Sequence, residues 1–164
     1  HTNMFATDAH GPDSQQTPFE RWTIDPTAHR VERSVIDPDS QEFPRPNETL
    51  IGKPYRYAYA MALPKGGDPS FLANTTLYKH DLEAGTRETH DFGAGKVPGE
   101  FVFVPKANAS TEDDGWLMGY VVNVANDTTD FVILNAADFA GAPQAVVHIP
   151  HRIPPGFHGN WVAA

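Results

Sequence analysis

A pattern that occurs three times is the feature of this sequence that most restricts what the chain can fold into. Each occurrence is a short apolar or aromatic segment that ends on Asp or Asn, and the three segments are 19–25, 75–81 and 130–135. Their last residues, Asp25, Asp81 and Asn135, are separated by steps of 56 and 54 residues. A repeat of this length favours the blades of a β-propeller, each of which is a four-stranded sheet.

The residues between these points also predict strands. The 15 prolines and 13 glycines are spread along the chain, where they would interrupt most helices. Short runs rich in Val, Thr and aromatic residues, bounded by turn residues, predict β-hairpins instead. The predicted hairpins pair 22–25 with 30–36, 77–81 with 86–92, and 116–124 with 130–134, and a further strand follows at 145–149.

The chain is too short to close a propeller. We expect it to supply about two and a half to three blades, whereas propellers close with about 4 to 8. An open ring leaves unpaired strand edges, which natural proteins avoid, and the first residue is His1 instead of Met. We therefore expect 1–164 to be one partial β-propeller domain of a longer chain, whose N-terminal portion completes the ring. A self-contained β-sandwich is the alternative.

Composition excludes several classes of function. Twelve basic and 21 acidic residues give a net charge of −9, which repels phosphate backbones and argues against a nucleic-acid partner. With no cysteine, neither disulfides nor thiolate metal sites are possible, as fits a reducing compartment. The longest apolar run, 58–63, is far shorter than the ~20 residues of a membrane-spanning helix. We expect a cytoplasmic protein.

Three residues with metal-site chemistry follow the repeated segments. Glu42, Glu100 and His158 lie 17, 19 and 23 residues after the ends of the three segments. Two carboxylates and an imidazole thus occupy equivalent positions in successive repeats. This predicts that the three side chains point toward one central axis, where a metal could bind. The remaining histidines stand in turns, outer strands or beside proline and carry no such pattern.

Each of the three residues also has a simpler interpretation. His158 lies between Gly156 and Gly159, which let the backbone approach another group closely, yet it could be a buried histidine that donates to a backbone carbonyl. A single histidine makes no catalytic site, because such metals need about three or more protein ligands. Glu42 and Glu100 could orient metal-bound imidazoles, or could face water or pair with an arginine such as Arg45.

Several motifs, in this order, resemble the carotenoid cleavage oxygenases, a family that includes the lignostilbene dioxygenases. The motifs are 41–45 (QEFPR), 99–105 (GEFVFVP), the acidic turn into 113–117 (DDGWL), and the ending from 134–139 (LNAADF) through 153–159 (IPPGFHG), and the opening 4–8 and the segment 19–25 also fit. The resemblance covers essentially the whole chain and implies that residues 1–164 are the C-terminal third of a full-length member. Two residues depart from the common pattern: Phe101, where many members have proline or a small residue, and Asn135, commonly Asp.

The resemblance implies a fold and a metal site. The family fold is a seven-bladed β-propeller whose axial iron(II) is held by four histidines, three of them backed by glutamates. His158 would be the last of the four ligands, and Glu42 and Glu100 would be two of the three glutamates that orient metal-bound histidines. The other three histidines and one glutamate should lie upstream of His1.

The resemblance also implies the reaction. An iron(II) dioxygenase of this kind uses dioxygen to cleave a conjugated C=C bond of an apolar polyene (a carotenoid or apocarotenoid) or a stilbene into two carbonyl products. No side chain of this chain need act as a nucleophile or general base, and a carotenoid substrate would favour peripheral contact with a membrane. The alternatives are a non-catalytic β-rich scaffold or binding module, and an isomerase on the same architecture.

Overall fold

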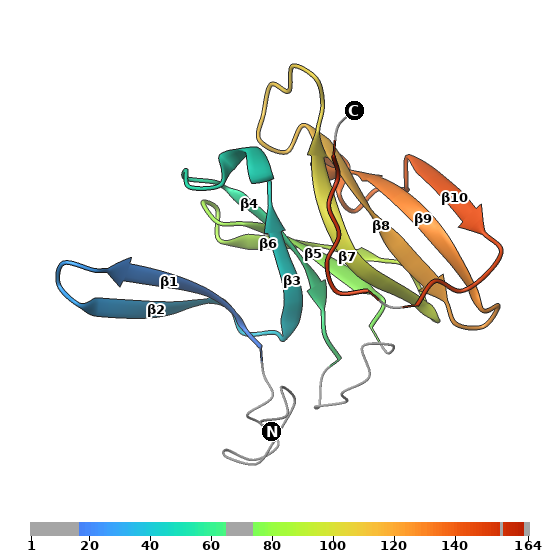
Figure 1. Cartoon of the computed structure of the whole chain (residues 1–164), viewed down its shortest axis with the longest axis horizontal. Helices are drawn as coiled ribbons and strands as arrows, with labels where there is room; N and C mark the ends of the chain where they lie inside the picture. Colours follow the sequence, from blue (N-terminus) through green and yellow to red (C-terminus); the bar gives the residue numbers. More distant parts are fainter. Residues whose placement is uncertain (1–16, 65–73, 155, 163–164) are drawn as a thin grey trace, which may run out of the picture.

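The computed structural model describes residues 17–64, 74–154 and 156–162, and it is an all-β structure (Figure 1). Its strands form two four-stranded antiparallel sheets and a separate two-stranded hairpin. The opening 4–8, which contributes to the family resemblance, lies outside the described residues. No helix within the described ranges has the length and apolar character needed to cross a bilayer.

The strands follow one another in space in the order of the sequence. The hairpin contains β1 (Phe19–Asp25) and β2 (Arg30–Asp37). The first sheet contains β3 (Gln41–Pro46), β4 (Tyr57–Ala62), β5 (Thr76–Asp81) and β6 (Thr86–Asp91), and the second contains β7 (Lys96–Pro105), β8 (Gly115–Asn123), β9 (Thr128–Asn135) and β10 (Ala145–Ile149). Every hairpin strand predicted from the sequence is present. Two complete four-stranded meanders and a hairpin are the composition expected of a partial propeller.

The repeated Asp or Asn ends a strand in each case and closes the turn that follows. The Asp25 carboxylate accepts hydrogen bonds from the backbone N–H groups of Thr27 and Ala28, at 3.0 and 2.9 Å. Asp81 accepts the equivalent bonds from residues 83 and 84, and the turn ends on Gly85, whose φ of 66° suits glycine. Asn135 instead caps the 3-10 helix η4 (Ala136–Asp138) through Ala137 N–H, at 3.1 Å. The sequence repeat thus marks turn chemistry.

The hydrophobic core lies between the two sheets. Residues alternate in burial along β8 and β9, so that one face of the second sheet packs on the first sheet. The rings of Tyr59 and Phe103 stack across the two sheets at 5.8 Å between centroids. The buried core residues are Tyr59, Met61, Leu77, Phe101, Phe103, Leu117, Val121, Val132, Leu134, Ala136 and Phe139.

Two buried or partly buried sets of polar contacts also join the sheets. The Glu112 carboxylate, in the loop between β7 and β8, accepts hydrogen bonds from the backbone N–H groups of Arg56 and Tyr57 at 2.7–2.9 Å. The Lys79 ammonium of β5 donates to Asp113 and to the backbone carbonyl of Ala136, both at 2.8 Å. These contacts fix the register of one sheet on the other, and they bring β7 against β3 and β4.

Candidate functional site

The first strands of both sheets carry a β-bulge at the predicted site residues. In β3 the register shifts between Glu42 and Arg45, and in β7 it shifts between Pro98 and Phe101, around Glu100. A bulge inserts one extra residue and redirects the side chains beside it. In β3 the bulge places Phe43 at a φ of 55°, a left-handed conformation that costs a non-glycine residue about 1–2 kcal/mol.

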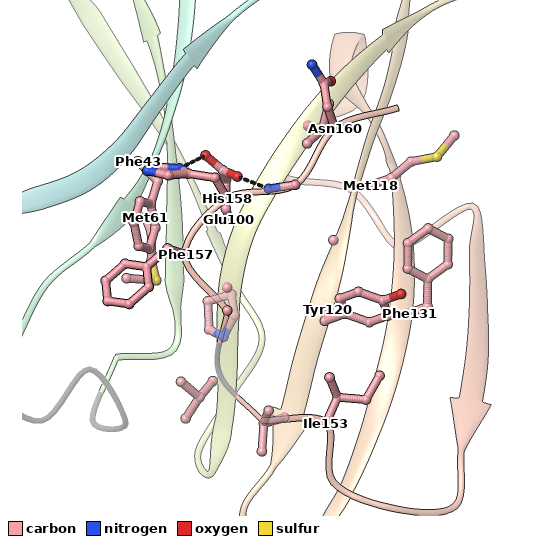
Figure 2. Close-up of a pocket in the computed structure, with 18 of the residues that line it drawn as sticks. Phe43, Met61, Glu100, Met118, Tyr120, Phe131, Ile153, Phe157, His158 and Asn160 are labelled. Carbon is pink, nitrogen blue, oxygen red and sulfur yellow. Dashed lines mark hydrogen bonds and ion pairs between the residues drawn. The ribbon is translucent and has the colours of Figure 1, made fainter. Parts of the chain in front are cut away.

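Glu100 and His158 are brought together although they are far apart in the sequence. Glu100 Oε1 lies 3.1 Å from His158 Nδ1, and Glu100 Oε2 accepts the backbone N–H of Gly159 at 2.9 Å (Figure 2). A carboxylate only accepts hydrogen bonds, so Nδ1 is the nitrogen that carries the hydrogen. No hydrogen bond of His158 Nε2 occurs within the described residues. This ring nitrogen is therefore available to a ligand.

The two partners differ sharply in exposure. The Glu100 side chain is 6 % exposed, whereas the His158 side chain is 68 % exposed. Within the described residues His158 is therefore exposed, and its Nδ1 contacts a carboxylate instead of a backbone carbonyl. The Arg45 guanidinium also lies 3.5 Å from Glu100 Oε1. Glu100 thus has both of the partners considered for it, an imidazole and an arginine.

Glu42 has different surroundings from Glu100. It lies opposite Met61 in the β3–β4 register and is half-buried. Within the described part of the chain its carboxylate makes no hydrogen bond or ion pair. The structure therefore places Glu42 on β3, an edge strand of the first sheet that contacts β7, but it does not bring Glu42 into the pair formed by Glu100 and His158.

The side chains around His158 are consistent with one ligand of a larger metal site. Among the described residues no group of three or more His, Asp or Glu side chains could hold a metal ion. His158 offers one free imidazole nitrogen, and the buried Glu100 fixes its tautomer, as carboxylates commonly do for metal-bound histidines. The residues present therefore fit an iron site in the position of a single protein ligand, and further imidazoles would have to come from outside the described residues.

An apolar pocket of about 740 Å³ opens beside this pair. It lies between the C-terminal segment and the face of the second sheet that points away from the core, and His158 is part of its wall (Figure 2). Phe43, Met61 and Phe157 line the end near His158, and Tyr120 and Phe131 line the other, with ring centroids 5.3 Å apart. An apolar wall beside a free imidazole nitrogen suits an apolar ligand or a further element of the chain.

Comparison with known proteins identifies the family. The chain matches the family described as retinal pigment epithelial membrane protein (RPE65) over residues 1–163. The chain belongs to this family. A carotenoid cleavage oxygenase of Mycobacterium tuberculosis is 39% identical over 98% of the chain and 32% of its own length. A lignostilbene-alpha,beta-dioxygenase (isozyme III) of Sphingomonas paucimobilis is 28% identical over 98% of the chain and 36% of its own length.

The fold of an RPE65-family protein agrees with the architecture described above. The crystal structure of cobalt-substituted Synechocystis apocarotenoid oxygenase superimposes with a TM-score of 0.84 at 32% identity. The match covers 95% of this chain and 32% of that protein. The chain thus spans about a third of the length of the relatives it matches, and the predicted all-β, partial-propeller fold and family membership are confirmed.

The structure accounts for both departures from the common family pattern. Phe101 is buried in the core, and its ring lies over the backbone of Gly119 across the β7–β8 pair. A large residue fits after Glu100 because the facing residue is glycine. Asn135 caps η4 with its side-chain oxygen, a role that Asn fills as well as Asp.

Sequence reasoning did not find every residue that contacts the pair. Arg45 appeared only as a possible partner for a glutamate, and Phe43 only within the QEFPR motif. Both lie in the β3 bulge, and both contact the segment that carries His158. The one feature of the sequence that indicated this bulge was Pro44, since proline inside a strand is typical of a bulge or an edge strand.

Proposed function

We propose that this chain is the C-terminal part of an iron(II)-dependent dioxygenase that cleaves a conjugated C=C bond of an apolar polyene or a stilbene. The single observation that carries the proposal is the contact of 3.1 Å between Glu100 and His158 Nδ1, with the other ring nitrogen free within the described residues. Family membership and the names of relatives, a carotenoid cleavage oxygenase and a lignostilbene dioxygenase, supply the reaction class.

The roles of the residues follow from this arrangement. His158 would hold iron through Nε2, while Glu100 orients the ring and makes it more basic. Glu42 would do the same for a histidine supplied from upstream, which accounts for its lack of a partner within the described residues. When bound, the iron would activate dioxygen, whose two oxygen atoms would end in the two carbonyl products. Neutral imidazoles leave the metal its full charge.

The rest of the protein would complete both the ring and the site. The second sheet presents half-buried or exposed apolar residues on the face away from the core, among them Met118, Tyr120 and Phe131. An apolar sheet face needs cover, and the relatives are about three times as long as this chain. We infer that upstream residues of the same protein pack here.

Membrane contact stays a prediction, which flotation of the complete protein with lipid vesicles would test.

The first measurement is the intact mass of the native protein. A mass near three times the 18.0 kDa of this chain would support the proposal. A mass near 18.0 kDa would contradict it, because one imidazole and two carboxylates cannot make a four-histidine site.

The decisive experiment measures iron in the complete protein and in the His158→Ala variant. We expect wild-type protein to bind about one iron per chain and His158→Ala to lose it with its circular dichroism unchanged, because a catalytic metal needs about three or more protein ligands. His151→Ala, which removes an exposed histidine near the same terminus, should retain iron. Stoichiometric iron in His158→Ala would overturn the ligand assignment.

An activity assay of the complete protein separates the classes of function. Conversion of a carotenoid or stilbene to two carbonyl products, with uptake of dioxygen, would distinguish a dioxygenase from an isomerase or a scaffold.

A further inference from the structure

The segment that carries His158 has little apolar packing to hold it. Residues 156–162 form no strand and are all exposed, although the segment runs along β7 (Figure 1). Exposed segments with few buried contacts open easily. A metal ligand must nevertheless be held close to its productive position. The polar contacts of this segment therefore determine where the His158 ring lies.

Arg45 makes the longest-range of these contacts. Its Nη2 donates to the backbone carbonyl of Gly159 at 2.9 Å, across 114 positions of sequence. The same nitrogen lies 2.9 Å from Glu48 Oε1, and Nη1 lies 3.5 Å from Glu100 Oε1. The Arg45 side chain is 17 % exposed, so these contacts are partly shielded from water. One guanidinium thus joins the residue after His158 to the carboxylate that orients its ring.

Other contacts hold the neighbouring residues. Glu48, held by Arg45, accepts a hydrogen bond from Asn160 Nδ2 at 2.8 Å through its second oxygen. Glu100 fixes the His158 ring and the Gly159 N–H. Three consecutive residues, 158 to 160, are therefore each bound to side chains of β7, the β3 bulge or the residues that follow it.

Phe43 supports the ring directly. Its left-handed backbone conformation places its ring 5.5 Å from the His158 imidazole, at an angle of 81°. This edge-to-face geometry is favourable for aromatic pairs. Strained residues of this kind persist only where the surrounding structure holds them in that conformation. The β3 bulge thus contributes one aromatic and one cationic contact to the same segment.

We propose that Arg45 is a positioning residue for the His158 ligand. It acts through Gly159 and Glu100 to direct the free ring nitrogen, and Phe43 assists from the same bulge. The inference rests on the proposed function, because it presumes that His158 binds the metal. It also links two blades, since the motif that supplies Glu42 for one histidine would supply Arg45 to position another.

The test uses the complete protein and cobalt(II) as a spectroscopic probe in place of iron. We expect Arg45→Met to weaken cobalt(II) affinity by about 10–100-fold, as loss of outer contacts to metal ligands commonly does. The visible absorption bands of bound cobalt(II) should shift, and the backbone amides of 157–161 should exchange hydrogen faster. Arg45→Lys, which keeps the charge but not the planar pair of donors, should recover part of the affinity. Arg152→Met, which removes an arginine paired with Asp127, is the matched control and should leave the spectrum unchanged.

Comparison with a Glu48 variant and with His158→Ala shows which proposal fails, the role of Arg45 or the proposed function. If Arg45→Met does not fold, Glu48→Gln serves instead: it removes the charge that pairs with Arg45 and leaves one acceptor oxygen for the two donors, Arg45 and Asn160, without a change of size. It should shift the cobalt(II) bands in the same direction. Wild-type affinity and spectrum in a folded Arg45 or Glu48 variant, together with loss of cobalt(II) in His158→Ala, would overturn the role of Arg45 alone. Full cobalt(II) binding in His158→Ala would overturn the proposed function itself.

Discussion

The ring of Phe101 lies directly over Gly119, its partner across strands β7 and β8. A Cβ atom added at Gly119 would overlap this ring. Phe101 is buried in the core, immediately after Glu100, so the space above Gly119 sets where the β7 bulge presents the carboxylate. The packing of the core and the geometry of the candidate site are therefore linked through one residue without a side chain.

Gly119→Ala should destabilise the protein and disturb the site together. Forcing extra volume into a packed core costs about 1–3 kcal/mol, which urea unfolding of the complete protein would measure. Iron affinity should fall as well, because displacement of Phe101 moves Glu100. Gly99→Ala is the matched control in the same strand pair, since a Cβ there meets nothing closer than 3.7 Å. Wild-type iron affinity in a destabilised Gly119→Ala, or equal stability and equal iron affinity in the two variants, would refute the link.

Glu100→Gln should weaken metal binding without unfolding the protein. Glutamine keeps the shape of the side chain but removes the charge that makes the His158 ring more basic. We expect a loss of about 10–100-fold in iron affinity or in turnover, measured by iron titration and by oxygen uptake. Glu32→Gln, a change in an exposed ion pair with Arg30, should leave iron affinity and turnover unchanged. Unchanged affinity and turnover in Glu100→Gln would leave Glu100 with a structural role only.

The sequence predicted the strands because turn residues and alternating apolar residues are local features. It also assigned Glu100 and His158 to one predicted metal site, through the repeat and the family resemblance, but it did not predict that these two side chains contact each other. It could not show that Arg45 reaches Gly159, because that contact depends on a bulge in one sheet and on the path of a terminal segment beside another. Lys79 and His80 show the same limit. Both lie in a strand whose pattern is ordinary, yet the packing of neighbouring elements buries them to 3 % and 2 % exposure.

His80 should make the stability of the protein depend on pH. Its Nε2–H donates to Gln41 Oε1 at 2.6 Å, because the Gln41 amide nitrogen is bound to the Asp39 carbonyl. Burial lowers the pKa of His80 from its usual 6.5; Asp37 opposes this shift and Arg87 adds to it. The unfolded chain therefore binds a proton more readily than the folded one. The stabilising contribution is complete above pH 6.5 and is lost as the pH falls toward the lowered pKa.

Urea unfolding of wild type and of His80→Gln at several pH values below and above 6.5 tests this dependence. The variant should be less stable at neutral pH, since it loses ring packing against Phe19, but its stability should fall less on acidification. His29→Asn, in an exposed turn with positive φ that Asn tolerates, should follow the wild-type curve. If the free energies of unfolding of wild type and His80→Gln changed with pH in parallel, the His80 imidazole would not titrate as proposed.

Lys79 should be a strong structural link between the two sheets. Its ammonium is buried, donates to Asp113 and to the Ala136 carbonyl, and lies 4.5 Å from the centre of the Tyr57 ring. Lys79→Met keeps much of the volume but leaves the Asp113 carboxylate, whose side chain is 14 % exposed, without its closest cation. Removal of one partner of a buried ion pair commonly costs about 3–5 kcal/mol, because the other charge stays buried without compensation.

A double-mutant cycle measures how much of this loss belongs to the pair. Asp113→Asn removes the charge that Lys79→Met would leave buried, so the double variant should be more stable than Lys79→Met alone when the complete protein is unfolded in urea. Lys106→Met breaks a more exposed ion pair with Asp114 near the same loop and should cost no more than about 1 kcal/mol. If Lys79→Met and Lys106→Met destabilised the protein equally, or if the double variant were no more stable than Lys79→Met, the Lys79–Asp113 pair would not be the strong link proposed here.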